Sequence, residues 1–293
     1  MHSGTGNPTH KPLADCVITQ PAKGLTLCVY PSLASTNDTA KGLCDASHGT
    51  IIVADTQTAG RGRHGRKFYS PSGCGIYMSL ILDPQRTSTP ISLLTPAAAV
   101  AVCETIEHMC DKKPQIKWVN DVLLEGKKIC GILTEAVIDN NGDISRVVVG
   151  IGVNFITPPG GYPPDIADTT RAIFDSADDV SPRTLPSDLF THTAGEDEPY
   201  STCSPHITRE QLITEIATRL VAGYEKGQLN EAYKKRLAYV GRRVYVIACD
   251  TTYEATALGV DRDFGLVVQT DTGELVALTS GEISIRLANA QQP

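Results

Sequence analysis

Residues 56–67 have the sequence Thr-Gln-Thr-Ala-Gly-Arg-Gly-Arg-His-Gly-Arg-Lys. The last eight of these residues include three glycines and four permanent positive charges, and no acid occurs from Thr56 to Ser70. Glycine lets backbone N–H groups approach an anion closely, and an arginine side chain can bind phosphate or carboxylate oxygens with two hydrogen bonds. The spacing is not that of a Walker P-loop. The stretch therefore predicts an anion-binding loop; a solvated basic loop and an Arg-Gly patch that binds nucleic acid are the alternatives.

The segments on both sides of this loop have the apolar patterns of strands and helices. Strands are predicted over residues 27–30, 50–55, 76–82, 115–118, 122–124, 128–138 and 146–155. Helices are predicted over residues 35–41, 92–109, 208–224 and 230–237. After Gly241 the pattern changes to short alternating strands joined by turns, which is typical of a small β-barrel. We therefore expect an α+β fold, with a mixed central β-sheet flanked by helices and a small C-terminal barrel.

Composition sets the expected domain boundaries. We expect a flexible N-terminal tail over residues 1–25, a main domain over 26–240 and the barrel over 241–293. Residues 157–206 hold eight of the 18 prolines, nine acids and two bases, so they are expected to form an acidic loop inserted into the main domain. Of the 26 Lys+Arg and 33 Asp+Glu in the chain, 24 of each lie outside this insert, so the net charge of −7 belongs to it.

The composition also argues against several classes of protein. A general binder of nucleic acid or of an anionic membrane needs concentrated positive charge, which a net charge of −7 does not supply. The longest apolar run, residues 96–103, is far shorter than the roughly 18 residues that a membrane span requires. The nine cysteines include no Cys-x-x-Cys pair, which is typical of reduced cysteines in the cytosol. Residues 1–20 have no apolar signal core and no arginine, so we expect a cytoplasmic protein without nucleic-acid or membrane partners.

The second segment that indicates a functional site is Lys117-Trp-Val-Asn-Asp121. A lysine on a buried strand is costly unless it meets an anion, although a lysine at a strand edge can also reach solvent by its long stem. Gly150-Ile-Gly-Val-Asn154 is a weaker glycine pattern, which a strand that ends in a turn would also show.

Taken in their order along the chain, five motifs resemble those of the biotin protein ligase family. They are Ser35-Thr-Asn37, the arginine- and glycine-rich loop, Lys117-Trp-Val-Asn-Asp121, Gly131-Ile-Leu133 and Gly150-Ile-Gly-Val-Asn154. Ser280-Gly-Glu-Ile-Ser-Ile-Arg286 also resembles the closing strand of that family's C-terminal SH3-like barrel. The resemblance covers roughly residues 27–155 and 208–287. Because only 34 residues precede the first motif, it implies a monofunctional enzyme without the N-terminal DNA-binding domain of bifunctional bacterial members.

The resemblance implies an ATP-dependent biotin–[acetyl-CoA-carboxylase] ligase. Such an enzyme forms biotinyl-5′-AMP from biotin and ATP and then transfers biotin to a lysine of the biotin carboxyl carrier domain of a carboxylase. Mg²⁺ is implied as an ion carried by the nucleotide phosphates, so no metal site made by the protein alone is expected. Family members include monomers and homodimers. The alternatives are a lipoate–protein ligase, which should differ in its ring-binding residues and basic loop, and a non-catalytic binding module, which leaves Lys117 and Gln57 unexplained.

Carried over position by position, the resemblance implies catalytic roles for Lys117 and Arg63. The implied biotin site comprises Ser35, Thr36, Asn37, Gln57, Gly60, Arg61, Arg63, Lys117, Gly131 and Leu133. The implied ATP and adenylate site comprises Arg61, Arg63, Arg66, Phe68, Trp118, Asn120, Asn154 and Arg286. Ser35, Thr36 and Gln57 are uncharged donors and acceptors, which suits the ureido ring of biotin. For Trp118 a structural role in the core is the alternative.

Overall fold

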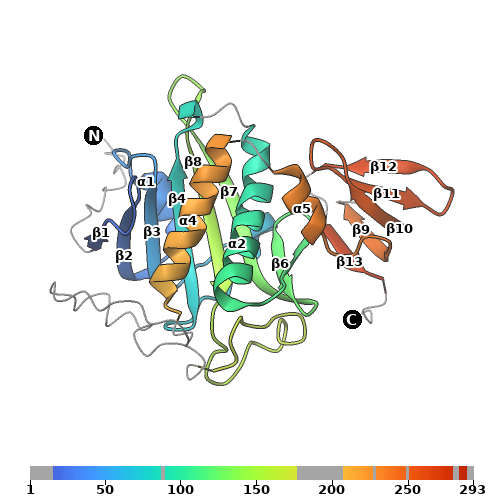
Figure 1. Cartoon of the computed structure of the whole chain (residues 1–293), viewed down its shortest axis with the longest axis horizontal. Coiled ribbons are helices and arrows are strands. Elements are labelled where there is room, and N and C mark those ends of the chain that lie inside the picture. The colour runs from blue at the N-terminus through green and yellow to red at the C-terminus, as the bar shows by residue number, and fades with distance from the viewer. Residues whose placement is uncertain are drawn as a thin grey trace, which may run out of the picture.

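The computed structural model describes residues 16–86, 90–176, 207–226, 229–248, 251–279 and 284–288. They form a mixed eight-stranded sheet, in the order β1-β2-β3-β4-β8-β7-β6-β5, and a five-stranded sheet, in the order β12-β11-β10-β9-β13. Figure 1 shows the small sheet beside the large one, at the end where β6 lies. The predicted α+β fold with a C-terminal β domain is confirmed.

The large sheet contains all seven strands that the apolar pattern predicts, and one more. Its strands are β1 (Val17–Thr19), β2 (Thr26–Leu33), β3 (Thr50–Gln57), β4 (Gly75–Leu82), β5 (Gln115–Lys117), β6 (Asp121–Leu124), β7 (Lys127–Ile138) and β8 (Ile144–Asn154). Strands β2 and β3 are parallel, and all other neighbours in this sheet are antiparallel.

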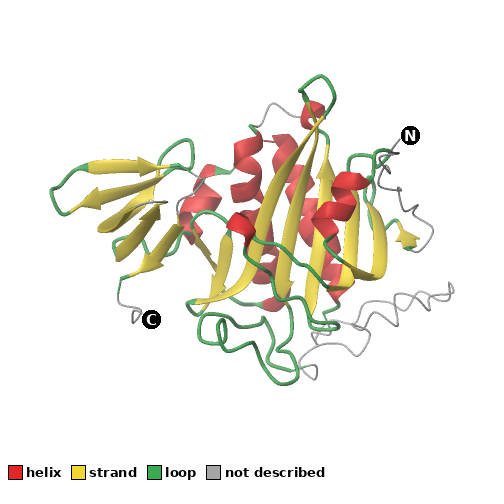
Figure 2. Cartoon of the chain, turned by 180° about the vertical axis from the view of Figure 1, so that it is seen from behind, coloured by secondary structure: helices red, strands yellow, loops and turns green. Residues whose placement is uncertain are grey.

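The helices cover both faces of this sheet. They are α1 (Thr36–Gly42), α2 (Leu94–Cys110), α4 (Arg209–Lys226) and α5 (Asn230–Arg236). Figure 1 shows α2 and α4 lying across the front of the sheet, where Leu27 and Val29 of β2 face them in the main core. The alternate residues Cys28 and Tyr30 point to the opposite face and pack with Ala40 of α1, which Figure 2 shows from behind. The face that carries α1 also carries the predicted site.

The predicted N-terminal tail is wrong for the residues that precede β2. Val17–Thr19 form the edge strand β1, in which Ile18 pairs with Cys28, and Leu25 is buried. A strand of three residues is too short to give a periodic pattern, so the sequence does not reveal it. The first 15 residues of the predicted tail lie outside the described residues.

The predicted insert begins later than the sequence suggests. Residues 177–206 lie outside the described residues, but residues 157–176 pack against the end of the sheet. Ala172 and Ile173 are buried, and the Ile173 N–H donates to the Asn154 carbonyl at 2.9 Å. Prolines and acids surround these apolar residues, so the average composition of the stretch predicts a loop and does not reveal that they are buried.

The small sheet is joined to the main domain by specific contacts. Its strands are β9 (Arg243–Ala248), β10 (Thr251–Val260), β11 (Leu266–Thr270), β12 (Leu275–Leu278) and β13 (Ser284–Leu287). The indole N–H of Trp118 donates to the Phe264 carbonyl at 2.9 Å, and the rings of Tyr233 and Phe264 meet edge to face with centroids 5.3 Å apart. These contacts hold the small sheet beside β5. In the part of the chain that the structure describes, no helix has both the length and the apolar character needed to cross a membrane.

Candidate active site

The basic loop connects β3 to β4 and folds back on itself. An isolated bridge joins Arg61 to Lys67, and the Gly62 N–H donates to the Arg66 carbonyl at 2.7 Å. At the tip, Gly65 has a φ of 71°, a left-handed conformation that glycine adopts without strain. The loop is therefore a tight, internally hydrogen-bonded turn, and its Arg61 and Arg63 side chains reach partners on α1, on β7 and at Asn120.

An uncharged polar group lies at the start of α1, next to the loop. Thr36 donates to Gln57 Oε1 through its N–H at 2.9 Å and its hydroxyl at 3.2 Å. Gln57 Nε2 in turn donates to Ser70 Oγ at 3.0 Å. Ser35 is the N-cap of α1, where it accepts a hydrogen bond from the Asp38 N–H. The fold thus brings Ser35, Thr36 and Gln57 together, and the side chains described as bonded directly to Thr36 and Gln57, those of Ser70 and Ser79, are uncharged.

Asn37 joins three elements of the fold. Its Oδ1 accepts a hydrogen bond from the Ser79 hydroxyl at 2.6 Å, and its Nδ2 donates to the Leu133 carbonyl at 3.2 Å and to Glu135 Oε2 at 2.8 Å. A Cβ atom on Gly150 would overlap the Asn37 side chain, so glycine is required beneath it. Each polar atom of the Asn37 amide is hydrogen-bonded within the protein, and the residue positions α1 on the sheet.

Two glycines leave a flat strip on the sheet beside this group. Gly131 of β7 and Gly152 of β8 are register partners. A Cβ atom on Gly152 would lie 2.6 Å from the Phe68 ring, and one on Gly131 would lie 3.3 Å from it. Gly131, which is predicted to belong to the biotin site, is covered by Phe68 in this structure. A ligand that lies on the strip must displace that ring.

The Arg61 side chain forms ion pairs with two acidic residues of the protein. Its Nη2 lies 2.7 Å from Asp38 Oδ1 and 3.1 Å from Glu135 Oε1, which also binds Lys41 Nζ at 2.8 Å. Burial alone would raise the pKa of Glu135, but hydrogen bonds from Lys41 and Asn37 and the charges of Lys41 and Arg61 hold that pKa below its ordinary value. These ion pairs fasten the start of the basic loop to α1 and β7.

A second group of cations lies around Lys117 and the carboxylate of Asp121. We call it the Asp121 cation cluster, and it consists of Arg63, Arg66, Lys117, Lys128 and Arg286. Lys128 Nζ lies 2.6 Å from Asp121 Oδ1, and Lys117 Nζ lies 3.9 Å from Asp121 Oδ2. Arg63 Nη1 donates to Asn120 Oδ1 at 3.2 Å. Five positive charges against one negative charge make this end of the site strongly attractive to an anion.

The electrostatic state of Lys117 reflects these neighbours. Burial lowers the pKa of Lys117; the charge of Asp121 raises it, and the like charges of Lys128, Arg286 and Arg66 lower it further. Burial and the charge of Arg66 also lower the pKa of Arg63, although a guanidinium stays protonated at neutral pH. A bound anion would offset the cost of desolvation and the repulsion at both residues, so the cluster has the charge that suits a phosphate or carboxylate.

Two residues predicted to contact the nucleotide have structural contacts in this structure. Trp118 is 3% exposed and belongs to the main core, which favours the alternative of a structural role. Asn154 is 8% exposed, and its Nδ2 donates to the carbonyls of Lys128 at 3.4 Å and Arg171 at 3.1 Å. Strand alternation shows on which face a side chain lies but not which segment covers it. That is why the sequence does not reveal these contacts.

Several residues of the site have no role in the sequence prediction. They are Asp38, Ser70, Ser79, Asp121, Lys128 and Glu135. Asp121 and Lys128 lie within or next to the motifs quoted above, so their proximity to Lys117 in an expected hairpin is a signal that could have identified them. For Ser70 and Ser79 the sequence offers no such signal, because their partners are distant along the chain.

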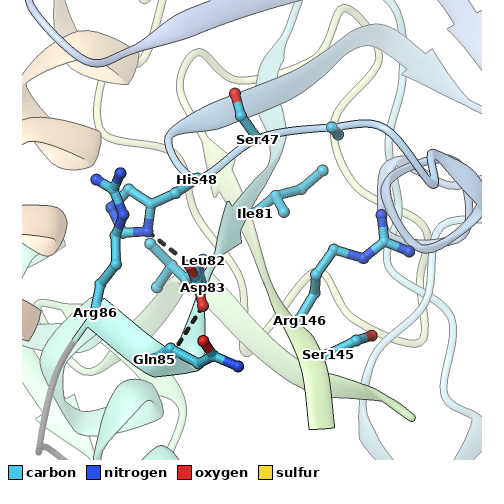
Figure 3. Close-up of a pocket in the computed structure, with 10 residues that line it drawn as sticks. Ser47, His48, Ile81, Leu82, Asp83, Gln85, Arg86, Ser145 and Arg146 are labelled. Carbon is cyan, nitrogen blue, oxygen red and sulfur yellow. Dashed lines mark hydrogen bonds between the residues drawn. The ribbon is translucent and has the colours of Figure 1, made fainter. Parts of the chain in front are cut away.

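A hollow of about 420 Å³ lies away from these residues (Figure 3). Its lining includes His48, Asp83 and Arg146, and His48 Nδ1 accepts a hydrogen bond from the Asp83 N–H at 3.1 Å. The hollow lies where Leu82 pairs with Val147, at the end of β4 and β8 opposite the pair Gly75–Asn154. None of its lining residues is a predicted site residue.

Two family models match the chain. The biotin/lipoate A/B protein ligase family matches residues 29–154, and the biotin protein ligase C-terminal domain matches residues 239–286. The bifunctional ligase/repressor BirA of Bacillus subtilis (strain 168) is 40% identical over 156 residues, which are 53% of this chain and 48% of that protein. A biotin–[acetyl-CoA-carboxylase] ligase of Paracoccus denitrificans is 37% identical over 140 residues, 44% of this chain and 58% of that protein. The chain thus spans about half the length of these relatives.

Solved structures agree with the family models. The biotin protein ligase from Aquifex aeolicus in complex with biotin and ATP superposes with a TM-score of 0.67 at 24% identity, covering 89% of this chain and 99% of that chain. The Leishmania major biotin protein ligase in complex with biotin gives a TM-score of 0.53 at 20% identity, covering 89% of this chain and 100% of that one. This likeness establishes the fold, and the two family models account for both of its sheets. The chain therefore contains a domain of the biotin/lipoate A/B protein ligase family at residues 29–154 and a biotin protein ligase C-terminal domain at residues 239–286.

Proposed function

We propose that this protein is an ATP-dependent biotin–protein ligase. It activates biotin as biotinyl-5′-AMP and transfers the biotinyl group to a lysine of a biotin carboxyl carrier domain. One observation carries the proposal: an uncharged hydrogen-bonding group at Thr36 and Gln57 and the Asp121 cation cluster lie on the same sheet face, with Gly131 and Gly152 between them. The names of its relatives, biotin–[acetyl-CoA-carboxylase] ligase among them, support biotin as the acid.

The uncharged group suits one end of biotin. A ureido ring offers a carbonyl acceptor and two N–H donors and carries no charge, so it needs neutral partners in a largely buried place. Ser35, Thr36 and Gln57 supply hydroxyl and amide groups, and Ser35 and Thr36 are buried. Bound biotin would exchange its own hydrogen bonds for some of those that link Thr36 to Gln57 and Gln57 to Ser70.

The cation cluster suits the reacting end. In the first step a carboxylate oxygen of biotin attacks the α-phosphorus of ATP, an O–P bond forms, and the bond to pyrophosphate breaks. The two reactants are both anions, so positioned positive charge lowers the cost of bringing them together and stabilises the charge that develops. Lys117 and Arg63 would contact the meeting point, and Arg66 and Arg286 would contact the departing pyrophosphate. Arg61, fastened by Asp38 and Glu135, would hold the loop in place.

In the second step the amine of the acceptor lysine attacks the biotinyl carbonyl. An amide bond forms, the bond from that carbonyl to the phosphate oxygen breaks, the nitrogen releases a proton to solvent, and AMP leaves. A basic loop closed over the adenylate would keep it from water until the carrier domain arrives. Mg²⁺ would enter bound to the phosphates of ATP. Phosphate oxygens and water can complete its shell, and the described residues contain no group of three or more His, Cys, Asp or Glu that could hold a metal.

Exchange of ³²P-pyrophosphate into ATP tests the first step. We expect exchange that depends on biotin and not on lipoate, measured in parallel with the same enzyme preparation. Exchange driven by lipoate alone would replace the proposal with a lipoate–protein ligase, and exchange with neither acid would refute an adenylating enzyme. Transfer is tested by incubating the protein with biotin, ATP, Mg²⁺ and a biotin carboxyl carrier domain, with an acceptor-lysine-to-arginine variant as the control.

A further inference from the structure

We propose that Cys16 and Cys28 form a reversible disulfide when the protein meets a peroxide, and that this bond fastens the edge strand β1 to β2. The two sulfurs make up a modification site that is separate from the residues of the candidate active site and independent of the proposed function. Three observations point to it: the contact between the two thiols, their unequal burial and the place of β1 at the end of the large sheet.

The fold brings the two thiols together. Ile18 of β1 pairs with Cys28 of β2 in antiparallel register, and Cys16 lies two residues before Ile18, in a bend where β1 begins. Residues two apart on a strand share a face of the sheet. Cys16 accordingly packs against the cluster on the α1 face that contains Cys28 and Ala40, and a hydrogen bond joins the Cys16 and Cys28 side chains. Both are thiols in this structure, and their sulfurs are already neighbours.

The two cysteines differ in burial, which sets the order in which they react. Cys28 is 2% exposed, whereas Cys16 is half-buried. Burial, with smaller effects from the charge of Cys16 and the hydrogen bond to it, raises the pKa of Cys28 to about 11, so Cys28 stays a thiol at neutral pH. Oxidation of a thiol depends on access to the sulfur and on its ionisation, so a peroxide reacts first with Cys16.

The oxidation takes place in two steps. The Cys16 sulfur attacks one oxygen of hydrogen peroxide, an S–O bond forms, the O–O bond breaks and water leaves. The Cys28 sulfur then attacks the sulfur of the Cys16 sulfenic acid, an S–S bond forms and the S–O bond breaks. The departing hydroxide takes the proton of the Cys28 thiol and leaves as a second water. Together the two thiols lose two electrons and two protons, and one peroxide is reduced to two waters.

The bond acts where the sheet has the fewest strand partners. Strand β1 has three residues, and it lies at the end of the strand order, so its partner in the sheet is β2 alone (Figure 1). A link from Cys16 to Cys28 closes the loop between them and reduces the freedom of the unfolded chain. Oxidation is therefore expected to hold β1 on the sheet and to stabilise the fold, and two molecules of a thiol such as glutathione reverse it by leaving as their own disulfide.

Mass spectrometry of a non-reduced tryptic digest tests the bond directly. Cleavage after Lys23 and Lys41 places Cys16, Cys28 and Cys44 in three different peptides. When the full chain is treated with hydrogen peroxide at increasing concentration, the first product at Cys16 should be its peptide joined to that of Cys28, and dithiothreitol should separate the two. The proposal is wrong if that first product is a sulfinic acid or a bond to another cysteine. It is also wrong if Cys16 and Cys28 remain thiols after the exposed Cys44 has been oxidised.

Variants separate the bond from other effects of peroxide. Oxidation should raise the thermal unfolding midpoint of the wild type by roughly 5–10 °C and slow amide hydrogen exchange in Val17–Thr19. Cys16→Ser should lose both effects, and Cys44→Ser, at an exposed cysteine, should keep both. Cys28→Ala repeats the test from the other strand should Cys16→Ser not fold. A midpoint that does not rise on oxidation of the wild type, or that rises equally in Cys16→Ser, would overturn the proposal.

Discussion

The buried ion pair between Arg209 and Asp55 gives the sharpest expectation for stability. Arg209 Nη1 lies 3.0 Å from Asp55 Oδ1, and the side chains are only 6% and 9% exposed. Arg209 is the first residue of α4, and Asp55 belongs to β3. Asp55 also accepts hydrogen bonds from the Ser72 hydroxyl and from the Gly73 N–H at 3.0 Å. The pair thus fastens α4 to the sheet and to the end of the basic loop.

Arg209→Met removes the cation and leaves a buried carboxylate with two hydrogen bonds and, among the described residues, no other ion-pair partner. Breaking a buried pair by removing one member costs about 3–5 kcal/mol, because the remaining charge is not compensated. The substitution also removes the hydrogen bond from Arg209 Nη1 to the Gly75 carbonyl at 3.1 Å. We therefore expect the free energy of unfolding to fall by at least about 3 kcal/mol.

Urea-induced unfolding, followed by circular dichroism, measures this change. Arg219→Met is the matched control on the same helix, since Arg219 pairs with Glu104 and Glu215 and all three side chains are about one-third exposed. Such pairs are worth about 0–1 kcal/mol. The double variant Arg209→Met, Asp55→Asn should cost less than the sum of the two single variants, because each single variant already breaks the same pair. An Arg209→Met cost no larger than that of Arg219→Met would refute the reasoning.

Three further outcomes follow from the site. Lys117→Ala should abolish biotin-dependent pyrophosphate exchange and leave the unfolding midpoint near that of the wild type; normal exchange by the folded variant would contradict its role. Burial lowers the pKa of Lys117 from the ordinary value of 10.5. If activity needs the protonated amine, the loss of activity with rising pH should therefore begin at a lower pH than it would for an unperturbed lysine. A pH–rate profile measures this. Gly152→Ala puts a Cβ 2.6 Å from the Phe68 ring, so overpacking should lower the free energy of unfolding by about 1–3 kcal/mol. Gly223→Ala in α4 has open space around it and should raise the free energy of unfolding by about 0.4–1 kcal/mol. Urea unfolding measures both changes.

Retention of the adenylate is a separate expectation of the basic loop. Arg63→Gly should release free biotinyl-AMP faster than the wild type, because Arg63 reaches across the site to Asn120 at 3.2 Å and helps to close it. Chromatography of the filtrate after incubation with biotin and ATP measures the released adenylate. Equal release from both proteins would show that Arg63 does not retain it.

Local patterns were sufficient for the main elements of the fold. The Ala/Val run of α2 and the buried strands β3 and β4 have strong periodicity or strongly apolar composition, so their existence could be predicted within a few residues of their ends. Strand β1 and the packed residues Ala172 and Ile173 could not be predicted. Each is short, and each is stabilised by partners distant along the chain rather than by its own pattern.

The chemical groups and their order along the chain, including the basic loop, the lysine at position 117 and the glycines of β7 and β8, can be read directly from the amino-acid sequence. Which charged groups come into contact depends on how the chain is packed in three dimensions. Arg61 and Arg63 lie two positions apart in the same loop, yet Arg61 pairs with Asp38 and Glu135, whereas Arg63 faces Asn120 and the Asp121 cation cluster. These partners are 23, 74 and 57 residues away along the chain. The strength of a charge interaction depends on distance in space and on burial, and both are set by the packing of the sheet.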